Sequence, residues 1–342
     1  MLDVKQTLQA LVEQPSPPGA EEQIREATQK LLEQLGYAYR VDAKGNLLIG
    51  SPGPKKIVVT AHLDEIGLMV KRVTNGGMLE VQELGGLYPW KWGEQPVEIM
   101  ADTPFPGVIS FGCIHTNHPG STVQHARVAP LKWDDAIIYT GISREDVINR
   151  GVHPGTRVAL GRERRVVTEL NDLLVSYFID DRADIVAMLM LLEMFGGKLP
   201  EEVLFAATTS EEVGGEGAQY LLHSLQPDVC IALEIGPLVP ESIFQIDDQP
   251  TIWVTDGYAS TSAADLRLLR RTCASLGMEP HWQPLSRGGS DASCTAAKGL
   301  CARPITLGLP VENSHGLEIM HRNAPANLAK LSKALIHNIL AE

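Results

Sequence analysis

"IVVTAHLDEIGLMV", residues Ile57–Val70, begins as an apolar strand and then places a histidine, an aspartate and a glutamate where the apolar run breaks. Four of its first five residues are β-branched, which is typical of a strand buried in a helix-covered sheet. Polar side chains at the end of such a strand need a chemical reason, because burial without partners costs free energy. The stretch therefore predicts both a sheet strand and a functional site at its carboxyl end.

Strands and helices alternate along the second half of the chain. Strand patterns at 173–179, 202–210 and 229–236 are separated by helical patterns at 181–196 and 214–225. Such alternation is typical of a sheet with helices on both faces. We therefore predict an α/β fold built on a mixed sheet.

A segment of different composition and residue pattern precedes this alternation, between residues 68 and 165. The stretch is rich in Gly and Pro, carries a hairpin signal at Asn75-Gly76-Gly77, and has short strand-like runs with little helical periodicity. We interpret 68–165 as an inserted β-barrel-like domain. The catalytic α/β domain then consists of residues 1–67 and 166–342.

Charge and composition exclude several classes of partner. The 342 residues carry a formal net charge of −13. Nucleic acids and anionic membranes bind basic surfaces, so neither is expected here. A small neutral or cationic substrate agrees better with this charge.

The cysteines and the apolar segments indicate a cytoplasmic protein. The cysteines are odd in number and contain no C-x-x-C pair, which disfavours a disulfide framework and a thiolate zinc site. The first residues lack the basic flank and the cleavage site of a signal peptide, and no stretch of 18 apolar residues predicts a membrane span.

Charged side chains follow four of the predicted strands. Because the carboxyl ends of parallel strands meet at one edge of a sheet, we expect these side chains to converge there. Imidazole and carboxylate groups suit zinc, and also cobalt or manganese. The candidates are His62 and Asp64, Asp180 and Asp181, Glu211 and Glu212, and Glu234, with His315 in "ENSHGLE" as a later addition.

Five motifs together resemble one enzyme family. The stretches "AHLDEIG", "DDRAD", "TSEEVGGEGA", "ALEIG" and "ENSHGLE" are similar to those of the M-forty-two family of metallo-aminopeptidases. This family includes glutamyl and deblocking aminopeptidases that assemble into tetrahedral particles. The resemblance covers nearly the whole chain and implies the sheet of co-catalytic zinc peptidases, with a β-rich dimerisation domain inserted in it.

The resemblance also implies a role for each residue of the set. It implies two divalent metal ions per subunit, zinc or alternatively cobalt or manganese, and a metal-bridged water activated by Glu211 as general base. Asp64 would orient the first histidine. Most relatives carry Asp where this chain has Glu234, and the longer side chain is expected to alter metal preference. The implied metal ligands are His62, Asp180, Glu212, Glu234 and His315.

The residues themselves support parts of this assignment. In a strand, residues two apart share a face, so Asp64 can accept a hydrogen bond from the His62 ring while Glu65 points elsewhere. We expect Asp181 to pair with Arg182 and cap the following helix. "RGGSDAS", residues 287–293, is interpreted as a turn followed by a helix N-cap at Ser290 or Asp291, outside the site.

Three other functions are compatible with parts of the sequence. A carboxypeptidase or deacylase of the M-twenty type shares the ligands but has its extra domain between the fourth ligand and the last histidine. Here the longer gap comes first, with 118 positions from His62 to Asp180 and 81 from Glu234 to His315. Glycoside hydrolysis is disfavoured by the 5% aromatic content, and a catalytically inactive metal-binding assembly protein by the intact ligand set.

The expected activity is the release of N-terminal amino acids from short peptides. A carboxypeptidase would need an Arg or Lys clamp for the opposite terminus, and basic residues near the motifs are few. The insertion is expected to mediate self-association, because the resembling family builds dimers that assemble into a hollow dodecamer.

Overall fold

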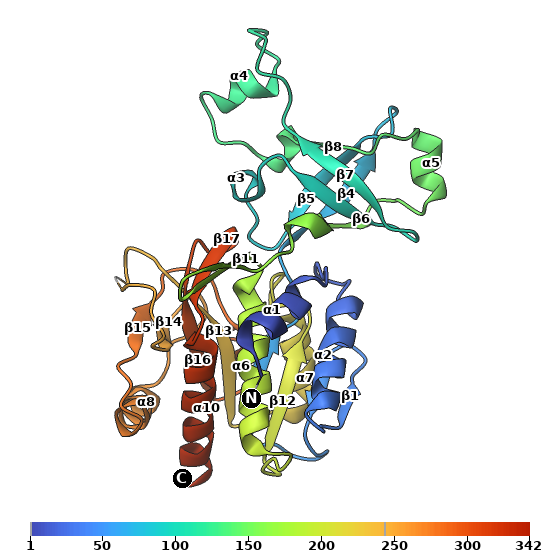
Figure 1. Cartoon of the computed structure of the whole chain (residues 1–342). Helices are drawn as coiled ribbons and strands as arrows, with labels where there is room; N and C mark the ends of the chain where they lie inside the picture. Colours follow the sequence, from blue (N-terminus) through green and yellow to red (C-terminus); the bar gives the residue numbers. More distant parts are fainter. Residues whose placement is uncertain (1, 243) are drawn as a thin grey trace.

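Four parallel strands form the centre of an 11-stranded sheet (Figure 1). The computed structural model describes residues 2–242 and 244–342 of the chain. In order across the sheet, the central strands are β12 (Val203–Thr208), β3 (Ile57–His62), β13 (Val229–Pro237) and β16 (Arg303–Glu312). The β-branched run at the start of "IVVTAHLDEIGLMV" is therefore the strand β3, which is buried along its whole length.

Antiparallel strands extend the sheet on both sides, which makes it a mixed sheet as predicted. The strands β14 and β15 branch from β16. The flanking strands are β1 (Tyr39–Val41) and β2 (Leu47–Ile49) beside β12, β17 (Leu317–His321), β11 (Leu173–Tyr177) and β10 (Thr168–Leu170) beyond β16, and the branch β14 (Thr251–Thr255) and β15 (His281–Pro284).

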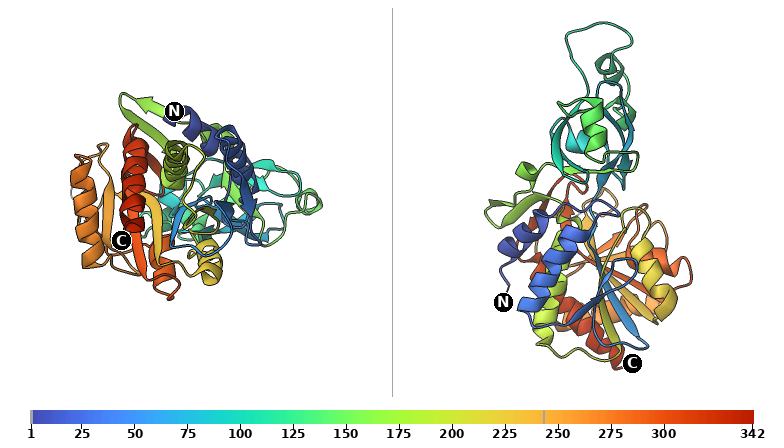
Figure 2. Two further views of the ribbon diagram at one scale, coloured as in Figure 1. Left: turned by 90° about the horizontal axis from the view of Figure 1, so that it is seen from below. Right: turned by 90° about the vertical axis from the view of Figure 1, so that its right-hand side faces the viewer.

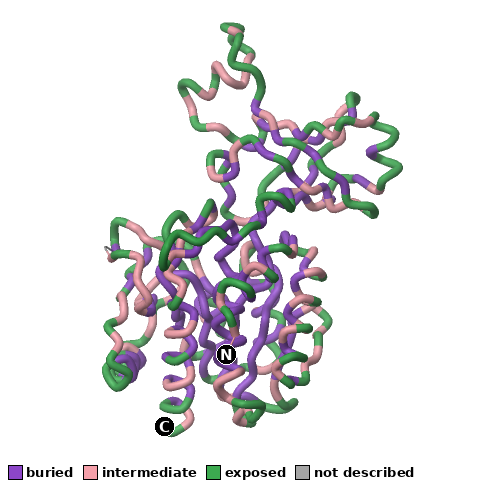
Figure 3. The backbone as a smooth tube through the Cα atoms, viewed as in Figure 1, coloured by how far each residue is buried: buried purple, intermediate pink, exposed green. Residues whose placement is uncertain are grey.

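Helices cover both faces of the sheet, because alternate residues of each buried strand point to opposite sides. Val59 and Phe205 join one apolar cluster, whereas their neighbours Val58 and Leu204 join another. The first face packs against α1 (Val4–Val12), α2 (Glu22–Gln34), α6 (Ile179–Phe195), α8 (Ala263–Ser275) and α10 (Ala324–Leu340), and the second against α7 (Glu216–Leu225) and α9 (Asp291–Ala296). Figure 2 shows α7 on the side of the sheet opposite to α1 and α2, and Figure 3 shows the buried strands between these layers.

The inserted region closes into a six-stranded antiparallel barrel, which confirms the expected second architecture. Its turn at Gly77 has a φ of +80°, and a Cβ there would meet the backbone of Ile142. In order around the barrel the strands are β4 (Gly67–Val73), β5 (Leu79–Leu84), β8 (Ile137–Tyr139), β7 (Phe105–Ser110), β6 (Pro96–Met100) and β9 (Arg157–Leu160). Short helices connect them: α3 (Pro89–Trp92), α4 (Thr122–Ala126), η1 (Trp133–Asp135), α5 (Arg144–Asn149) and η2 (Arg162–Arg164).

The barrel stands beyond the carboxyl ends of the central strands (Figure 1). β3 ends at His62 and β4 begins at Gly67, so a short connection leads from the sheet into the barrel. The barrel strands thus lie inside the predicted insertion except for Gly67, the first residue of β4, and the domain limits at 67/68 and 165/166 stay a prediction.

Candidate metal centre

Two histidines each direct their Nε2 atom toward the carboxylate of Asp180. Nε2 of His62 lies 3.1 Å from Oδ1 of Asp180, and Nε2 of His315 lies 3.5 Å from Oδ2 of the same residue. His62 ends strand β3, Asp180 follows β11, and His315 lies in the turn between β16 and β17. Each oxygen of Asp180 therefore faces a different histidine, which is the arrangement that a bridging ligand requires.

The other ring nitrogen of each histidine is held by a backbone carbonyl. Nδ1 of His62 lies 3.0 Å from the carbonyl oxygen of Asp64, and Nδ1 of His315 lies 3.0 Å from that of Gly86. An Nδ1–H that donates to a carbonyl leaves Nε2 with a free lone pair, which is the usual state of a metal-binding imidazole. Gly86 belongs to the segment after β5, so the insertion supplies a main-chain group that positions His315.

Two further carboxylates complete two overlapping groups of potential ligands. Glu234, on β13, places Oε1 3.8 Å from Nε2 of His62, and Glu212 places Oε1 3.6 Å from Nε2 of His315. The structure thus brings all five sequence-predicted ligands together. Within each group, one ligand atom per residue lies within 4.8 Å of the others; the groups are His62, Asp180, Asp181 and Glu234, and Asp180, Glu212 and His315.

The electrostatics of these groups fit divalent cations. Burial raises the pKa of Glu212 to about 7, and burial together with the nearby Asp180 raises the pKa of Glu234 well above its usual range. Although burial alone would raise it, the hydrogen bonds from His315 and His62 hold the pKa of Asp180 well below its usual range. A protein without metal therefore keeps protons on crowded carboxylates, and cations at the same place would replace those protons.

Asp64 lies beside the ligands and holds the segment that follows β12. Its Oδ1 accepts the backbone N–H of Glu211 at 2.9 Å, and its Oδ2 accepts that of Glu212 at 3.0 Å. The His62 ring donates to the backbone carbonyl of Asp64, while the carboxylate lies 3.5 Å from Nδ1. The His62 ring thus bonds the main chain of Asp64, whereas the sequence predicted a hydrogen bond to the Asp64 carboxylate.

Glu318, the last residue of the "ENSHGLE" stretch, is a buried positioning residue to which the motif comparison assigned no role. Its Oε2 accepts the backbone N–H of Asp180 at 3.0 Å, and its Oε1 accepts that of His315 at 2.8 Å. One carboxylate on β17 thus fixes the main chain of two potential ligands. Its place in the same motif as His315, three residues further on, is the sequence signal for this role.

The expected ion pair between Asp181 and Arg182 is not formed, and this prediction is wrong. Arg182 instead donates to Glu65 at 2.6 Å, and Glu65 also pairs with Arg165 at 3.0 Å. All three of these side chains are fully buried. Oδ2 of Asp181 accepts the backbone N–H of His62 at 2.6 Å, so this carboxylate supports a ligand strand.

Arg182 also reaches the carbonyl that orients the first histidine. It donates to the carbonyl oxygen of Asp64 at 3.1 Å and to that of Leu63 at 2.9 Å. Because the His62 ring uses the same Asp64 carbonyl, the arginine fixes the acceptor that sets the ring orientation. Glu65 points away from the ligand cluster, as expected.

A cavity of about 420 Å³ opens beside the ligand cluster. Ser290 caps α9 as predicted, with its hydroxyl accepting from the N–H of Ser293, and Asp291 bonds the Thr208 hydroxyl at 2.6 Å. Contrary to the prediction that the "RGGSDAS" loop lies outside the site, Arg287, Gly288 and Gly289 line the cavity together with Asp180, Glu211, Glu212, Glu234 and His315.

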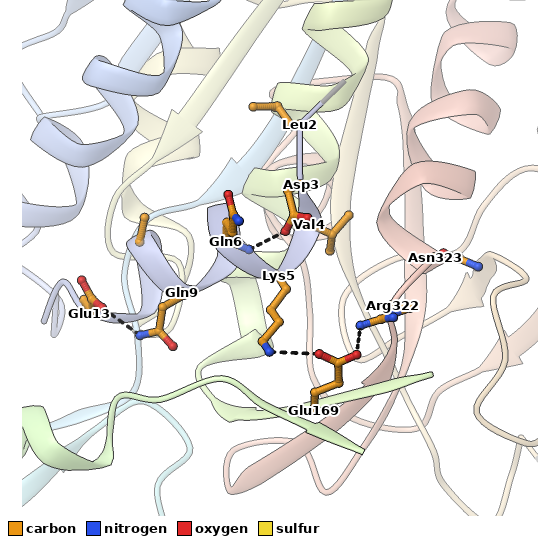
Figure 4. A pocket seen from close by; sticks show the side chains of 11 residues that line it. Leu2, Asp3, Val4, Lys5, Gln6, Gln9, Glu13, Glu169, Arg322 and Asn323 are labelled. Carbon is orange, nitrogen blue, oxygen red and sulfur yellow. Dashed lines mark hydrogen bonds and ion pairs between the residues drawn. The ribbon is translucent and has the colours of Figure 1, made fainter. Parts of the chain in front are cut away.

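A larger hollow of about 780 Å³ lies along α1, away from this chemistry (Figure 4). Its lining contains none of the predicted site residues. Figure 4 shows Lys5 and Arg322 both reaching Glu169, and the Lys5–Glu169 distance is 2.9 Å. The side chains of these ion pairs are partly exposed, so the hollow is a charged groove on the surface.

Among the described residues, no helix has the length and apolarity needed to cross a membrane.

The mixed sheet, the inserted barrel and the overlapping ligand groups define a metallohydrolase. The model of the family described as M42 glutamyl aminopeptidase matches residues 45–331, and the chain belongs to this family. The predicted family and the class of enzyme, an aminopeptidase, are thereby confirmed.

Known relatives resemble the chain to different extents. The lysyl aminopeptidase of Pyrococcus furiosus is 24% identical over 97% of this chain and 96% of its own length. The FrvX protein of Escherichia coli is 30% identical over 66% of this chain, and the match spans only 63% of FrvX. A solved TET1 peptidase of Pyrococcus horikoshii, which can assemble into a tetrahedron or a large octahedral shell, has a TM-score of 0.84 and 25% identity over 97% of this chain and 98% of its own.

Proposed function

We propose that the protein is a two-metal aminopeptidase that releases N-terminal amino acids from short peptides. The observation that carries the proposal is the division of Asp180, with Oδ1 toward His62 and Oδ2 toward His315. In this proposal His62, Asp180 and Glu234 hold one ion, and Asp180, Glu212 and His315 hold the other.

Two divalent ions at this place would polarise the scissile carbonyl and lower the pKa of water. Glu211 then takes a proton from the attacking water and returns it to the leaving amine. Its position supports this role, because it lines the cavity while Asp64 fixes its main chain. Burial raises the pKa of Glu211 well above its usual range, so this carboxyl holds a proton more readily than an exposed glutamate does.

Zinc is the proposed metal, with cobalt and manganese as alternatives, because the donor set combines imidazole nitrogen with carboxylate oxygen. Glu234 in place of the shorter Asp is the residue expected to change the preference among these ions. Metal content of the purified protein, measured by elemental analysis, tests both the number and the identity of the ions.

The carboxylates around the cavity support binding of a free terminal amine. One peptide in three forms tests this: with free termini, N-acetylated, and C-terminally amidated. Mass spectrometry of the metal-loaded protein should show stepwise loss of N-terminal residues from the free and amidated forms and a severe loss of rate with the acetylated form. A ladder that shrinks from the C-terminus would instead support a carboxypeptidase, and equal cleavage of the acetylated peptide would contradict the requirement for a free amine.

We also propose that the barrel mediates self-association into dimers that build a dodecamer. The assembly of the Pyrococcus horikoshii relative supports this, and so do exposed apolar residues on the barrel such as Val108 and Tyr139, which are paired across β7 and β8. Light scattering at micromolar concentration should show a large particle. A monomer under these conditions would overturn the proposal.

A cytoplasmic location completes the proposal. The cysteines are all free thiols, of which only Cys113 is exposed, as expected for a reducing compartment. Fractionation of cells that express the tagged protein tests the location, and recovery outside the cytoplasm would contradict it.

A further inference from the structure

Ser210, the residue before the proposed base, has a left-handed backbone conformation. Its φ is +56°, and the residue is buried. This conformation is strained for any residue with a Cβ, because the Cβ approaches the following carbonyl oxygen, and it persists only where neighbouring groups hold it. The direction in which Glu211 leaves the end of β12 therefore depends on what holds Ser210.

Main-chain hydrogen bonds depend on the turn at Ser210. Asp64 accepts the N–H groups of Glu211 and Glu212 together, and the carbonyl of Ser210 accepts the N–H of Glu216 at 3.1 Å. Successive N–H groups converge on one carboxylate where the backbone turns or alternates between left-handed and right-handed conformations. Ser210 is thus the point from which the segment of Glu211 turns toward Asp64.

The side chain of Ser210 is held by a residue from the N-terminal part of the chain. Its hydroxyl donates to Oε1 of Glu21 at 3.2 Å, across 189 positions of the sequence. The same oxygen accepts the N–H of Gly19 at 2.8 Å, so the Glu21 side chain is itself fixed. Within residues 2–242 and 244–342, this is the only hydrogen bond of the Ser210 hydroxyl. Glu21 is 4% exposed, and a buried hydrogen bond is costly to lose.

We infer that Glu21 is a positioning residue for the reaction, because through the hydroxyl of Ser210 it stabilises the left-handed turn from which Glu211 extends toward the cavity. The inference rests on the proposed function, in which Glu211 is the base. Glu21 and Ser210 do not belong to the described lining of the cavity, whereas Glu211 does. Loss of the bond between Glu21 and Ser210 should therefore slow turnover without weakening substrate binding.

Replacement of Glu21 by alanine tests this inference with the full-length, metal-loaded protein. The substrate is the aminoacyl p-nitroanilide that the unaltered protein cleaves fastest in a panel of such anilides. Without the bond the turn can relax, and we expect kcat to fall by about fivefold to thirtyfold, the rate equivalent of the strain at one left-handed residue. KM should change by less than about twofold, and the metal content should equal that of the unaltered protein.

Variants that keep or remove the same bond should follow a defined order. Glu21→Gln retains an oxygen that accepts from Ser210 and should lose little turnover. Ser210→Ala should lose as much as Glu21→Ala, and the double Ala variant should lose no more than either, because both substitutions break one bond. Glu22→Ala is the matched control, since it removes an exposed carboxylate from the next position of the chain, and it should leave kcat unchanged.

The substitution Ser210→Gly distinguishes positioning from a general loss of stability. Glycine adopts a positive φ without strain, so it no longer needs the bond from Glu21. In the Glu21→Ala background, Ser210→Gly should restore most of the lost kcat, although it replaces no contact of the missing carboxyl group. All kinetics are measured well below the unfolding temperature of each variant, so that lost stability alone leaves kcat unchanged.

Four outcomes overturn the inference. They are an unchanged kcat in Glu21→Ala, a rise in KM in place of the fall in kcat, a loss of metal, and no recovery when Ser210→Gly is added. If Glu21→Ala does not fold, comparison of Ser210→Ala with Ser210→Gly decides, because both keep Glu21 and only the Gly variant should retain most of the turnover.

Failure of the proposed function has a different signature. If the unaltered, metal-loaded protein cleaves no anilide and no peptide, the aminopeptidase assignment fails, and the inference fails with it. If Glu211→Gln keeps near-normal turnover, the base and its positioning residue are both excluded, whatever the effect of Glu21→Ala.

Discussion

Asp64 fixes the main chain of Glu211, because its Oδ1 accepts the Glu211 N–H at 2.9 Å. Asp64 follows β3 and Glu211 follows β12, and these strands are parallel neighbours in the sheet. The bond therefore ties together two carboxyl ends of the sheet at the place where the candidate ligands meet. The same bond fixes the backbone of Glu211, and thereby the position from which its side chain extends toward the cavity.

Replacing Glu211 by glutamine should remove the proposed base while leaving the metals bound. We expect turnover to fall by at least about a hundredfold, the lower end of what a general base contributes. Glu216→Gln is the control, since Glu216 is an exposed residue of the same segment that pairs with Lys44. Steady-state kinetics with metal content measured in parallel checks the prediction, and near-normal turnover in a metal-replete Gln variant would exclude Glu211 from the role.

Loss of the bridging carboxylate should have a different signature. Asp180→Ala removes the one group that faces both histidines, so we expect fewer than two metal equivalents together with lost activity. The exposed Asp228 offers a control substitution, Asp228→Ala, which should retain both ions. Two full equivalents in the Asp180 variant, by elemental analysis, would contradict the bridging assignment.

The buried pairing of Glu65 with two arginines should be a strong determinant of stability. Glu65→Ala leaves the guanidinium groups of Arg165 and Arg182 buried without their shared carboxylate, and removal of one partner from a buried pair costs about 3–5 kcal/mol. Urea unfolding of the metal-free protein measures this cost. Glu80→Ala, which breaks an exposed pair with Arg72, should leave the midpoint almost unchanged, and equal midpoints for the two variants would contradict the prediction.

Removal of metal should make stability fall as the pH rises. Burial raises the pKa of Glu212 to about 7 and that of Glu318 to about 8, so the folded chain binds these protons more tightly than the unfolded chain does. The carboxylates around His62 and His315 raise the pKa of both rings despite burial, which acts in the same direction. Asp180, with its lowered pKa, acts oppositely and loses its contribution only as the pH falls below its unfolded value.

The net expectation is that the metal-free protein loses stability between about pH 4.5 and pH 8. Added zinc should raise the unfolding temperature more at pH 8 than at pH 5.5, because ions then replace fewer protons. Thermal unfolding with chelator and with zinc checks this, and Glu212→Gln should flatten the slope. A metal-free protein that becomes more stable over this range would show that the cluster does not hold its protons as described.

The sequence predicted the fold well because the signals of the sheet are local. The β-branched run of β3 and the alternation of strands and helices after it determine which residues are buried, and the turn at Asn75-Gly76-Gly77 marks the first barrel hairpin. The order of the strands in the sheet could not be predicted from these local signals, because β3 pairs with β12 and β13 from much later in the chain.

The site was only partly predictable, for the same physical reason. Residues at strand ends are recognisable, and the structure brings His62, Asp180 and His315 together as expected. The partner of Arg182 was not predictable from the sequence. Glu65 lies in the segment between β3 and β4, and it becomes a neighbour of Arg182 only when that segment folds against α6. Likewise the position of Arg287 at the cavity depends on a loop anchored by hydrogen bonds to a distant strand, which no local pattern encodes.

The position of β3 in the sheet has a consequence for synthesis on the ribosome. β3 leaves the ribosome before either of its neighbours, β12 and β13, has been made, whereas every strand of the barrel lies within one continuous stretch of chain. Domains generally fold as units, and pairings across long separations form late. We therefore expect the barrel to fold first. His62 remains on a strand without its sheet neighbours until β13, which carries Glu234, has been translated. Nascent chains are thus committed to a barrel well before they can bind metal.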